Sequence, residues 1–370
     1  LVKGAAALGV SGATLQALGR SNILLAQPAE NKVRWVSPRG TIDVLDDYAY
    51  HVAIKMGYFG DIETTLEPGP IEATAGTKAV DTGQADVAYP SPGVYSLMIE
   101  QGSPLISVFE MCAYDVFDFA FRKGEALASV KDLEGKTISL GSAGWQGIVD
   151  PIIAQAGGDQ TTIEYVDAGP QWGQSLAQGQ VDSALSWAGL RAQWAAIGLD
   201  FDYILGKDWS KFPANSYVIR RSDFEDPAMA DIYSRYFRAW AQGLEFGYYN
   251  PVGATQITFE AQPALNDVFE DKQIAVESLG QLADVFRGDW DARGGWGWHN
   301  EDDWNLFLKT TFEIGQLSKE LTAADVLSND WVEAFNDFDH DAVKADAEAY
   351  ELSGDFASLS PPEGTGVASE

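Results

Sequence analysis

The chain has 370 residues, of which 46% are hydrophobic and 21% are charged, so it can bury a core in one large domain or two ordinary ones. Acidic residues number 55 against 24 basic ones, and the formal net charge of −31 argues against nucleic acid and anionic lipid as partners. The single cysteine, Cys112, excludes an intrachain disulfide, and the three histidines lack metal-ligand spacing. We therefore expect no metal and no cofactor.

Residues 1–29 are predicted to be the remnant of an export signal. The stretch is small and apolar, rich in alanine and glycine, and no acidic residue precedes Glu30. It is too weakly hydrophobic for a stop-transfer helix, and it is typical of the apolar and cleavage regions of a signal peptide. The run KGAAALG at 3–9 is similar to the segment after the arginine pair of Tat signals. We expect a periplasmic protein without a direct membrane anchor, exported by the Sec or the Tat route; an N-terminal arm is the alternative.

Strands and helices alternate along the next part of the chain. Apolar runs bounded by Gly and Pro predict strands at 33–37, 64–67, 85–89 and 105–111. Apolar residues at three- and four-residue steps predict helices at 45–59, 77–82 and 94–100. Repeated strand–helix units favour parallel sheets that are covered on both faces.

A second series of such units comes next, and then a helical region. Strands are predicted at 137–140, 163–166, 181–187 and 203–205, and helices at 148–156, 172–177 and 190–197. From Pro227 onward the periodicity is helical, through 232–246, 274–286 and 304–317. The aromatic run at 294–299 is predicted to be a turn that packs onto the first series, and 358–370 is predicted to be a flexible tail.

Four motifs in a fixed order resemble one protein family. They are MGYF at 56–59, GQADVA at 83–88, DLEGKTI at 132–138 and LAQGQVDSA at 176–184. Over about residues 33–320 the chain resembles the periplasmic solute-binding proteins of ABC importers, in the group of sulfonate-, nitrate- and thiamine-precursor-binding proteins. The resemblance implies an α/β chain with the type II periplasmic-binding-protein fold, in which two α/β lobes are joined by two crossing segments with a ligand cleft between them. It also implies two partners, a small-molecule ligand and the membrane permease of an ABC importer; we expect a monomer.

The two crossing segments are predicted at 116–123 and 216–221, because these stretches bracket a self-contained α/β block. Lobe two is then expected at 116–213. Lobe one is expected to be discontinuous, with 30–115 and 214–357, and to carry the C-terminal helices.

The ligand site is predicted in the loops at the carboxyl ends of the strands, where open α/β sheets bind ligands. The candidate ligand-binding residues are Arg39, Gly40, Thr41, Asp43, Ser91, Pro92, Tyr114, Asp115, Ser142, Ala143, Gly144, Trp145, Gln146, Trp187 and Asn215. The segment 142–146 is expected to be a clamp of backbone amides and one aromatic face, with an ordinary capped turn as the alternative. Asp43 caps the first helix or faces the cleft, and Trp187 stacks on the ligand or packs under its helix.

The predicted function is a receptor that binds a small molecule without chemical turnover. Four tryptophans in lobe two favour a planar aromatic ligand: Trp145, Trp172, Trp187 and Trp194. Carboxylates in the expected cleft loops outnumber Arg39, which suits a neutral or cationic heteroaromatic such as a thiamine-precursor-type pyrimidine; they are Asp43, Asp46, Glu110 and Asp115. The alternative ligand is an alkanesulfonate, nitrate or similar oxyanion held by Arg39 and backbone amides. An enzyme on the same fold is less favoured, because the chain has no cysteine cluster and His51 lies within a helix; a sensory module is a third class.

Overall fold

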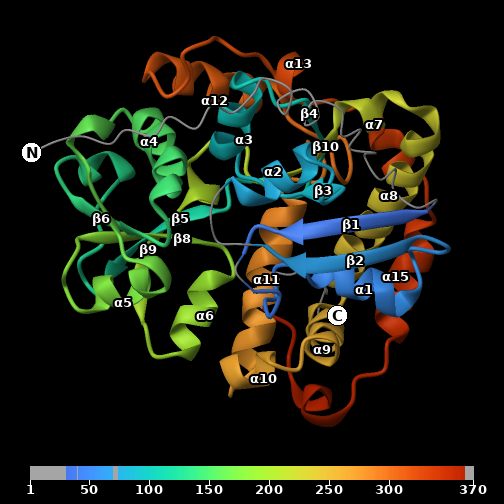
Figure 1. The fold of residues 1–370 in the computed structure, drawn as a ribbon. Helices are drawn as coiled ribbons and strands as arrows, with labels where there is room; N and C mark the ends of the chain where they lie inside the picture. The colour runs from blue at the N-terminus through green and yellow to red at the C-terminus, as the bar shows by residue number, and fades with distance from the viewer. Residues whose placement is uncertain (1–30, 40, 70–73, 363–370) are drawn as a thin grey trace, which may run out of the picture.

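The computed structural model describes residues 31–39, 41–69 and 74–362. The predicted signal remnant at 1–29, the candidate residue Gly40 and positions 363–370 of the predicted tail lie outside these ranges. Two mixed five-stranded sheets form the centres of two lobes; in Figure 1 the first lobe lies to the right, with its first strands in blue, and the second lobe lies to the left, in green. We call the part built on the first sheet lobe one and the part built on the second sheet lobe two.

The two sheets share one topology. The first has the order β2-β1-β3-β10-β4, with the bounds Glu63–Pro68, Lys32–Ser37, Val87–Ala88, Ser216–Arg220 and Leu105–Glu110. The second has the order β7-β6-β8-β5-β9, with the bounds Glu164–Asp167, Thr137–Leu140, Ser183–Trp187, Phe117–Arg122 and Phe201–Leu205. The first three strands of each order are parallel, and the fourth is antiparallel to both of its neighbours. The predicted two-lobed α/β fold is confirmed, although the sheets are mixed rather than parallel.

The segments predicted as crossings are themselves strands. Residues 116–123 contain β5 and residues 216–221 contain β10, and each strand lies inside the sheet of its lobe. The chain passes between the sheets just before these strands, at 111–116 and 206–215. The pairing of β5 with β8 and β9 buries its central residues, so this segment is a strand of the second sheet.

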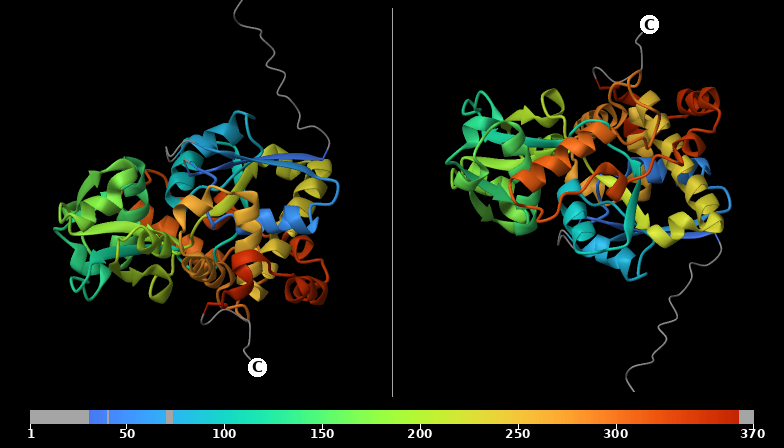
Figure 2. Two further views of the ribbon diagram at one scale, coloured as in Figure 1. Left: turned by 90° about the horizontal axis from the view of Figure 1, so that it is seen from below. Right: turned by 90° about the horizontal axis from the view of Figure 1, so that it is seen from above.

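Helices cover both sheets, and a long helical region completes lobe one. The helices before β10 are α1 Tyr48–Met56, α2 Ala75–Asp81, α3 Pro92–Glu100, α4 Gln146–Gln155, α5 Trp172–Ala177 and α6 Leu190–Ala196. Those after it are α7 Arg221–Glu225, α8 Pro227–Tyr249, α9 Pro251–Ala261, α10 Leu265–Val268, α11 Lys272–Arg287, α12 Glu301–Glu313, α13 Ala323–Val326, α14 Val332–Phe335 and α15 His340–Ala349. The three views show the orange helices, α11 and α12, running between the lobes (Figures 1 and 2).

Aromatic side chains fill the core between the first sheet and α8. Trp35 of β1 meets Trp240 of α8 edge to face at 4.9 Å, and Tyr217 of β10 lies 4.8 Å from the same ring. Such pairs add about 0.5–1.5 kcal/mol each to the gain from area burial. The turn at 294–299 packs onto this core as predicted: Trp296 is buried and donates a 2.9 Å hydrogen bond from Nε1 to Glu245.

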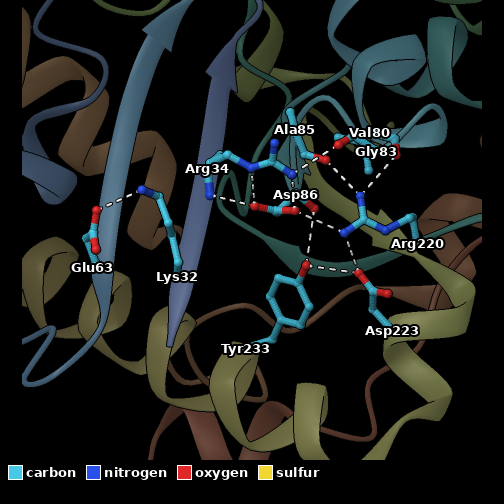
Figure 3. A network of polar contacts seen from close by, with 10 residues as sticks. All are labelled: Lys32, Arg34, Glu63, Val80, Gly83, Ala85, Asp86, Arg220, Asp223 and Tyr233. Atoms are coloured by element: carbon cyan, nitrogen blue, oxygen red, sulfur yellow. Dashed lines mark hydrogen bonds and ion pairs between the residues drawn. The ribbon is translucent and has the colours of Figure 1, made fainter. Parts of the chain in front are cut away.

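The GQADVA motif has a structural role, which Figure 3 shows. Buried Asp86 accepts hydrogen bonds from the backbone N and the guanidinium of Arg34 in β1, at 2.9 Å each, and from Arg220 in β10 at 3.0 Å. Burial raises the pKa of Asp86, but these hydrogen bonds hold it below its ordinary value overall. Arg220 also donates to the backbone carbonyls of Val80 and Ala85, at 3.1 and 2.7 Å. One carboxylate thus joins three strands of the first sheet.

Lobe two repeats this arrangement at its own motif. Asp182 accepts a 2.9 Å hydrogen bond from the backbone N of Thr137 in β6, as Asp86 does from Arg34 in β1. Arg122, at the end of β5, donates to the carbonyls of Leu176 and Val181, at 3.4 and 2.8 Å. The resemblance between the two motifs therefore reflects one helix–strand turn that is built twice.

Across 31–39, 41–69 and 74–362, none of the helices combines the length and apolar character that a bilayer crossing requires. The same described residues contain no group of three or more His, Cys, Asp or Glu side chains that could hold a metal ion.

Candidate functional site

A cavity of about 110 Å³ lies between the two lobes. A single water needs only about 10–15 Å³ by the same kind of measure, so the cavity has room for a small organic molecule. Its walls come from the loops after β1 and β3, from the crossings, from lobe two and from α11. The lining residues are Pro38, Arg39, Asp46, Tyr89, Pro90, Ser91, Val94, Val116, Phe117, Trp145, Ile148, Leu185, Trp187, Asn215, Leu282 and Phe286.

The cation of the cavity is paired with two carboxylates. Arg39 Nη1 lies 2.7 Å from Asp47 Oδ1, and Nη2 lies 3.3 Å from Asp46 Oδ1. Burial opposes the charge of Arg39, but the attraction of Asp47 and Asp46 holds its pKa above the ordinary value. Burial raises the pKa of Asp47 to about 6, against the attraction of Arg39. With both carboxylates ionised, the three side chains carry a net charge of −1, which is a poor receptor for an anion.

Three polar side chains of the cavity wall each have a buried oxygen without a protein partner in the described part of the chain. These atoms are Ser91 Oγ, Asp46 Oδ2 and Asn215 Oδ1. The amide nitrogen of Asn215 is already used, because it donates to the Tyr89 carbonyl at 3.3 Å. Two of the three oxygens are acceptors only, and a buried acceptor without a partner is costly. The wall is therefore suited to a ligand that carries N–H or O–H donors.

Two tryptophans of lobe two form an aromatic corner of the cavity. The rings of Trp145 and Trp187 meet at 5.9 Å and 86°. Behind them lies Trp172, which is stacked on Trp187 at 6.0 Å and meets Trp145 edge to face at 5.5 Å. The Nε1 of Trp172 donates to the Leu185 carbonyl at 2.9 Å, which fixes the supporting ring on β8. Two flat rings at nearly a right angle form a corner that suits a flat ligand.

Five of the predicted site residues line this cavity. They are Arg39, Ser91, Trp145, Trp187 and Asn215. They come from both lobes and from the crossing before β10, and the structure brings them together at the carboxyl ends of the strands, as the fold predicts.

The other described candidates do not line the cavity. Thr41 and Asp43 bond each other at 3.1 Å in an exposed loop. Asp43 does not cap the first helix either, because α1 begins at Tyr48 with Asp47 at the N-cap position. Tyr114 packs near Gly288, and Ser142 precedes the short 3₁₀ turn Ala143–Trp145.

The remaining candidates lie in two neighbouring places. Pro92 and Asp115 border a much smaller space of about 10 Å³ between the lobes. Ala143, Gly144 and Gln146 line a separate, open groove. The segment 142–146 therefore contributes the Trp145 ring to the cavity, and its other residues face elsewhere.

Several residues of the cavity were not predicted from the sequence. Asp46 was expected as a carboxylate near the cleft but not as a ligand-binding residue, and its neighbour Asp47 was not singled out, because the expected helix began at 45 and Asp43 preceded it. Tyr89 is the last residue of the strand predicted at 85–89 and lies close to the predicted Ser91. Its place at the carboxyl end of a strand was a signal that could have identified it as a site residue. Leu282 and Phe286 come from α11, far along the chain, and only the tertiary structure places them at the cleft.

Comparisons with known proteins agree with this architecture. The family model described as NMT1/THI5 like matches residues 47–254, more than half of the chain. The alkanesulfonate-binding protein of Xanthomonas axonopodis pv. citri bound to MOPS has a TM-score of 0.60 at 13% identity, over 82% of this chain and 100% of that one. A protein from Bordetella bronchiseptica has a TM-score of 0.60 at 15% identity, over 83% and 97%.

A third structure extends the likeness. The periplasmic nitrate-binding protein of Synechocystis has a TM-score of 0.58 at 12% identity, over 88% of this chain and 100% of that one. At these identities the likeness establishes the two-lobed fold. A search of curated proteins gave no match.

Proposed function

The chain belongs to the NMT1/THI5-like family, and we propose that it is a periplasmic solute-binding protein that captures a planar heteroaromatic molecule and delivers it to the permease of an ABC importer. The family predicted from the four motifs is confirmed by the match over 47–254. In this proposal lobe one comprises 30–115 with 214–357 and lobe two comprises 116–213. The protein acts as a monomer, reaches the periplasm by its N-terminal signal, and binds without turnover.

The proposal rests on which polar groups of the cavity already have a protein partner and which do not. Arg39 is already paired with Asp46 and Asp47, whereas Asp46 Oδ2 and Asn215 Oδ1 are buried acceptors without a protein partner among the described residues. A thiamine-precursor-type aminopyrimidine has N–H donors for these oxygens and a flat ring for the corner formed by Trp145 and Trp187. Mostly apolar walls with a few placed polar groups are usual for small-molecule sites.

A second candidate is an alkanesulfonate, nitrate or similar oxyanion. Arg39 lines the cavity and supplies a cation, and two of the structural relatives are described as binding alkanesulfonate and nitrate. In this case the anion has to share Arg39 with two carboxylates, one of which lies beside it in the cavity wall. That competition makes the oxyanion the weaker candidate.

Calorimetry on the purified protein separates the two candidates. The probes are 4-amino-2-methylpyrimidine, methanesulfonate and nitrate, each titrated at one pH and one ionic strength. We expect saturable binding of the pyrimidine with one site per chain and no chemical change in the recovered ligand. Saturable binding of an oxyanion alone contradicts the heteroaromatic proposal, and conversion of the ligand contradicts a receptor without turnover.

The partner is tested separately. Native mass spectrometry of the protein as purified identifies any ligand that is retained from the cell. Cross-linking of the ligand-loaded protein in the cell envelope should capture an importer permease; capture of a sensor kinase instead favours the signalling class.

A further inference from the structure

Helix α11 lies between the lobes and contacts both. It packs against α8 and α9 of lobe one and against α6 of lobe two. Figure 1 shows it in orange at the centre of the molecule, beside α6. It belongs to the helical region after β10, so its contact with lobe two is made across the cleft.

Three contacts tie α11 to lobe two. Ser278 Oγ donates a 2.8 Å hydrogen bond to the Gly189 carbonyl, at the residue before α6. A Cβ atom at Gly189 would lie 2.8 Å from Leu282 Cδ1 and Cγ, so the two segments meet there without room for a larger residue. Lys207 Nζ lies 2.6 Å from Asp284 Oδ2. The first two contacts are buried, and the third lies nearer the surface.

The same face of α11 borders the cavity. Leu282 and Phe286 line it, and with Ser278 they form a stripe at four-residue spacing on one side of the helix. Phe286 is stacked on Tyr48 of α1 at 6.0 Å. The backbone of the first crossing is tied to the end of this helix, since Ala113 N donates to the Val285 carbonyl at 3.0 Å. The stripe is thus held in position from lobe one while its middle residue touches lobe two.

We infer that α11 is a third wall of the ligand site and that Leu282 is a specificity-determining residue, which contacts the ligand on one side and Gly189 of lobe two on the other. This rests on the proposed function, in which the cavity holds a small molecule. One side chain then limits the size of the ligand and also forms part of the contact between the lobes. A ligand that displaces Leu282 would push directly on the Gly189 turn.

Thiol labelling tests this wall without knowledge of the ligand. The variants are Leu282→Cys and, as the matched control, Leu279→Cys; Leu279 is a buried leucine of the same helix that packs in the core and does not line the cavity. Each variant is treated with methyl methanethiosulfonate and followed by intact mass, with the wild-type chain giving the background from buried Cys112. We expect the thiol at 282 to react at least about tenfold faster, because opening of the lobes exposes the cavity without opening the core.

The pair Phe286→Cys and Val285→Cys repeats the comparison in case Leu282→Cys does not fold, because Val285 is buried in the core and Phe286 lines the cavity. Equal labelling rates within the folded pair overturn the inference. Each probe that binds in calorimetry is then added to the labelling reaction, and slower labelling at the cavity position supports the wall. If methanesulfonate protects and 4-amino-2-methylpyrimidine does not, the wall stands and the proposed ligand class fails. A probe that binds without slowing the reaction counts against the wall.

Discussion

Arg39 and Asp47 form a 2.7 Å ion pair in which both side chains are shielded from solvent, with Asp46 as a second carboxylate at 3.3 Å. The Oδ2 atom of each carboxylate is buried and has no hydrogen-bond partner among the described residues. The pair joins the loop after β1 to the start of α1, so it orders one wall of the cavity as well as setting its charge.

Removing the Arg39 side chain should therefore lower the free energy of unfolding even when no ligand is present. Arg39→Ala leaves two buried carboxylates without a counter-charge, and we expect a loss of about 3–5 kcal/mol in the free energy of unfolding by urea. The double variant Arg39→Ala with Asp47→Asn should recover part of this loss. Arg235→Ala is the control, because its pairs with Asp61 and Asp231 lie at the surface and such pairs contribute about 0–1 kcal/mol. Equal losses for the two arginines contradict a buried role for Arg39.

The aromatic corner should carry much of the affinity for a flat ligand. Trp145→Ala and Trp187→Ala should each weaken binding of 4-amino-2-methylpyrimidine by about 2 kcal/mol, roughly thirtyfold, when measured by calorimetry. Trp209→Ala is the matched control, since Trp209 is a half-buried tryptophan that does not line the cavity. If Arg39→Lys abolishes binding of methanesulfonate or nitrate while both tryptophan variants retain it, the oxyanion candidate is favoured instead.

A glycine contact sets how closely the lobes approach. A Cβ atom at Gly93 of α3 would lie 2.2 Å from the carbonyl oxygen of Gly147 in α4, which also accepts a 3.1 Å hydrogen bond from Gln316. Two lobes joined by two crossing segments are expected to close on their ligand, which should reduce the radius of gyration of the wild type in small-angle scattering. We expect Gly93→Ala to keep the lobes apart and to abolish this reduction. Gly76→Ala is the control: it is also a helical glycine of lobe one, and its nearest neighbour would be at 3.6 Å. Normal closure in Gly93→Ala would show that the lobes need not come this close.

Asp115 should make stability depend on pH. Its side chain is buried and accepts hydrogen bonds from Ser210 and from the backbone of Phe117, at 2.6 and 3.0 Å, and burial raises its pKa to about 7. Its unfolded pKa is about 3.9, so between about pH 4 and 7 the folded chain binds more protons. The stabilisation from this group is complete below about pH 4 and is lost as the pH rises to about 7, with a slope of at most about 1.4 kcal/mol per pH unit.

The variant Asp115→Asn isolates this effect from other buried groups. His51 has the opposite sign, because burial lowers its pKa to about 4 and its stabilisation is lost as the pH falls below about 6.5. On going from pH 5 to pH 7.5, the urea midpoint should therefore change in a more favourable direction in the variant than in the wild type, because the variant lacks the loss that Asp115 contributes. An unchanged difference would mean that Asp115 is ionised throughout.

The fold was largely predictable because its signals are local. Apolar runs with Gly and Pro at their ends predicted β1, β2, β4 and β6 to within about two residues, and the two Asp motifs marked where helices lead into strands. The strand predicted at 85–89 is shorter, with the bounds Val87–Ala88, although the backbone N of Asp86 also donates to the Arg34 carbonyl of β1 at 2.9 Å. The antiparallel pairing of β5 and β10 depends on long-range contacts that no local pattern records.

The site was predictable only in part, for a similar reason. Residues in the loops after strands could be proposed from the architecture, and Trp145 and Trp187 were found in this way. The choice among Asp43, Asp46 and Asp47 depended on where α1 begins, a boundary that sequence patterns place only to within a few residues. Leu282 and Phe286 read as an ordinary apolar helix face, because what they face is decided by the packing of α11 across the cleft.

Arg122 and Arg220 each donate to two backbone carbonyls at the helix–strand turn of their lobe, and these contacts bear on the order in which the chain folds. Arg122 reaches the Val181 carbonyl over a separation of 59 residues, wholly within one continuous stretch, whereas Arg220 reaches Asp86 over 134. A closed loop costs more entropy the longer it is, and domains fold as units during synthesis. Lobe two can therefore complete its sheet while lobe one still lacks its fourth strand. Pulse-labelled hydrogen exchange during refolding should show amides of β8 protected before those of β3, and simultaneous protection would place both lobes in one cooperative unit.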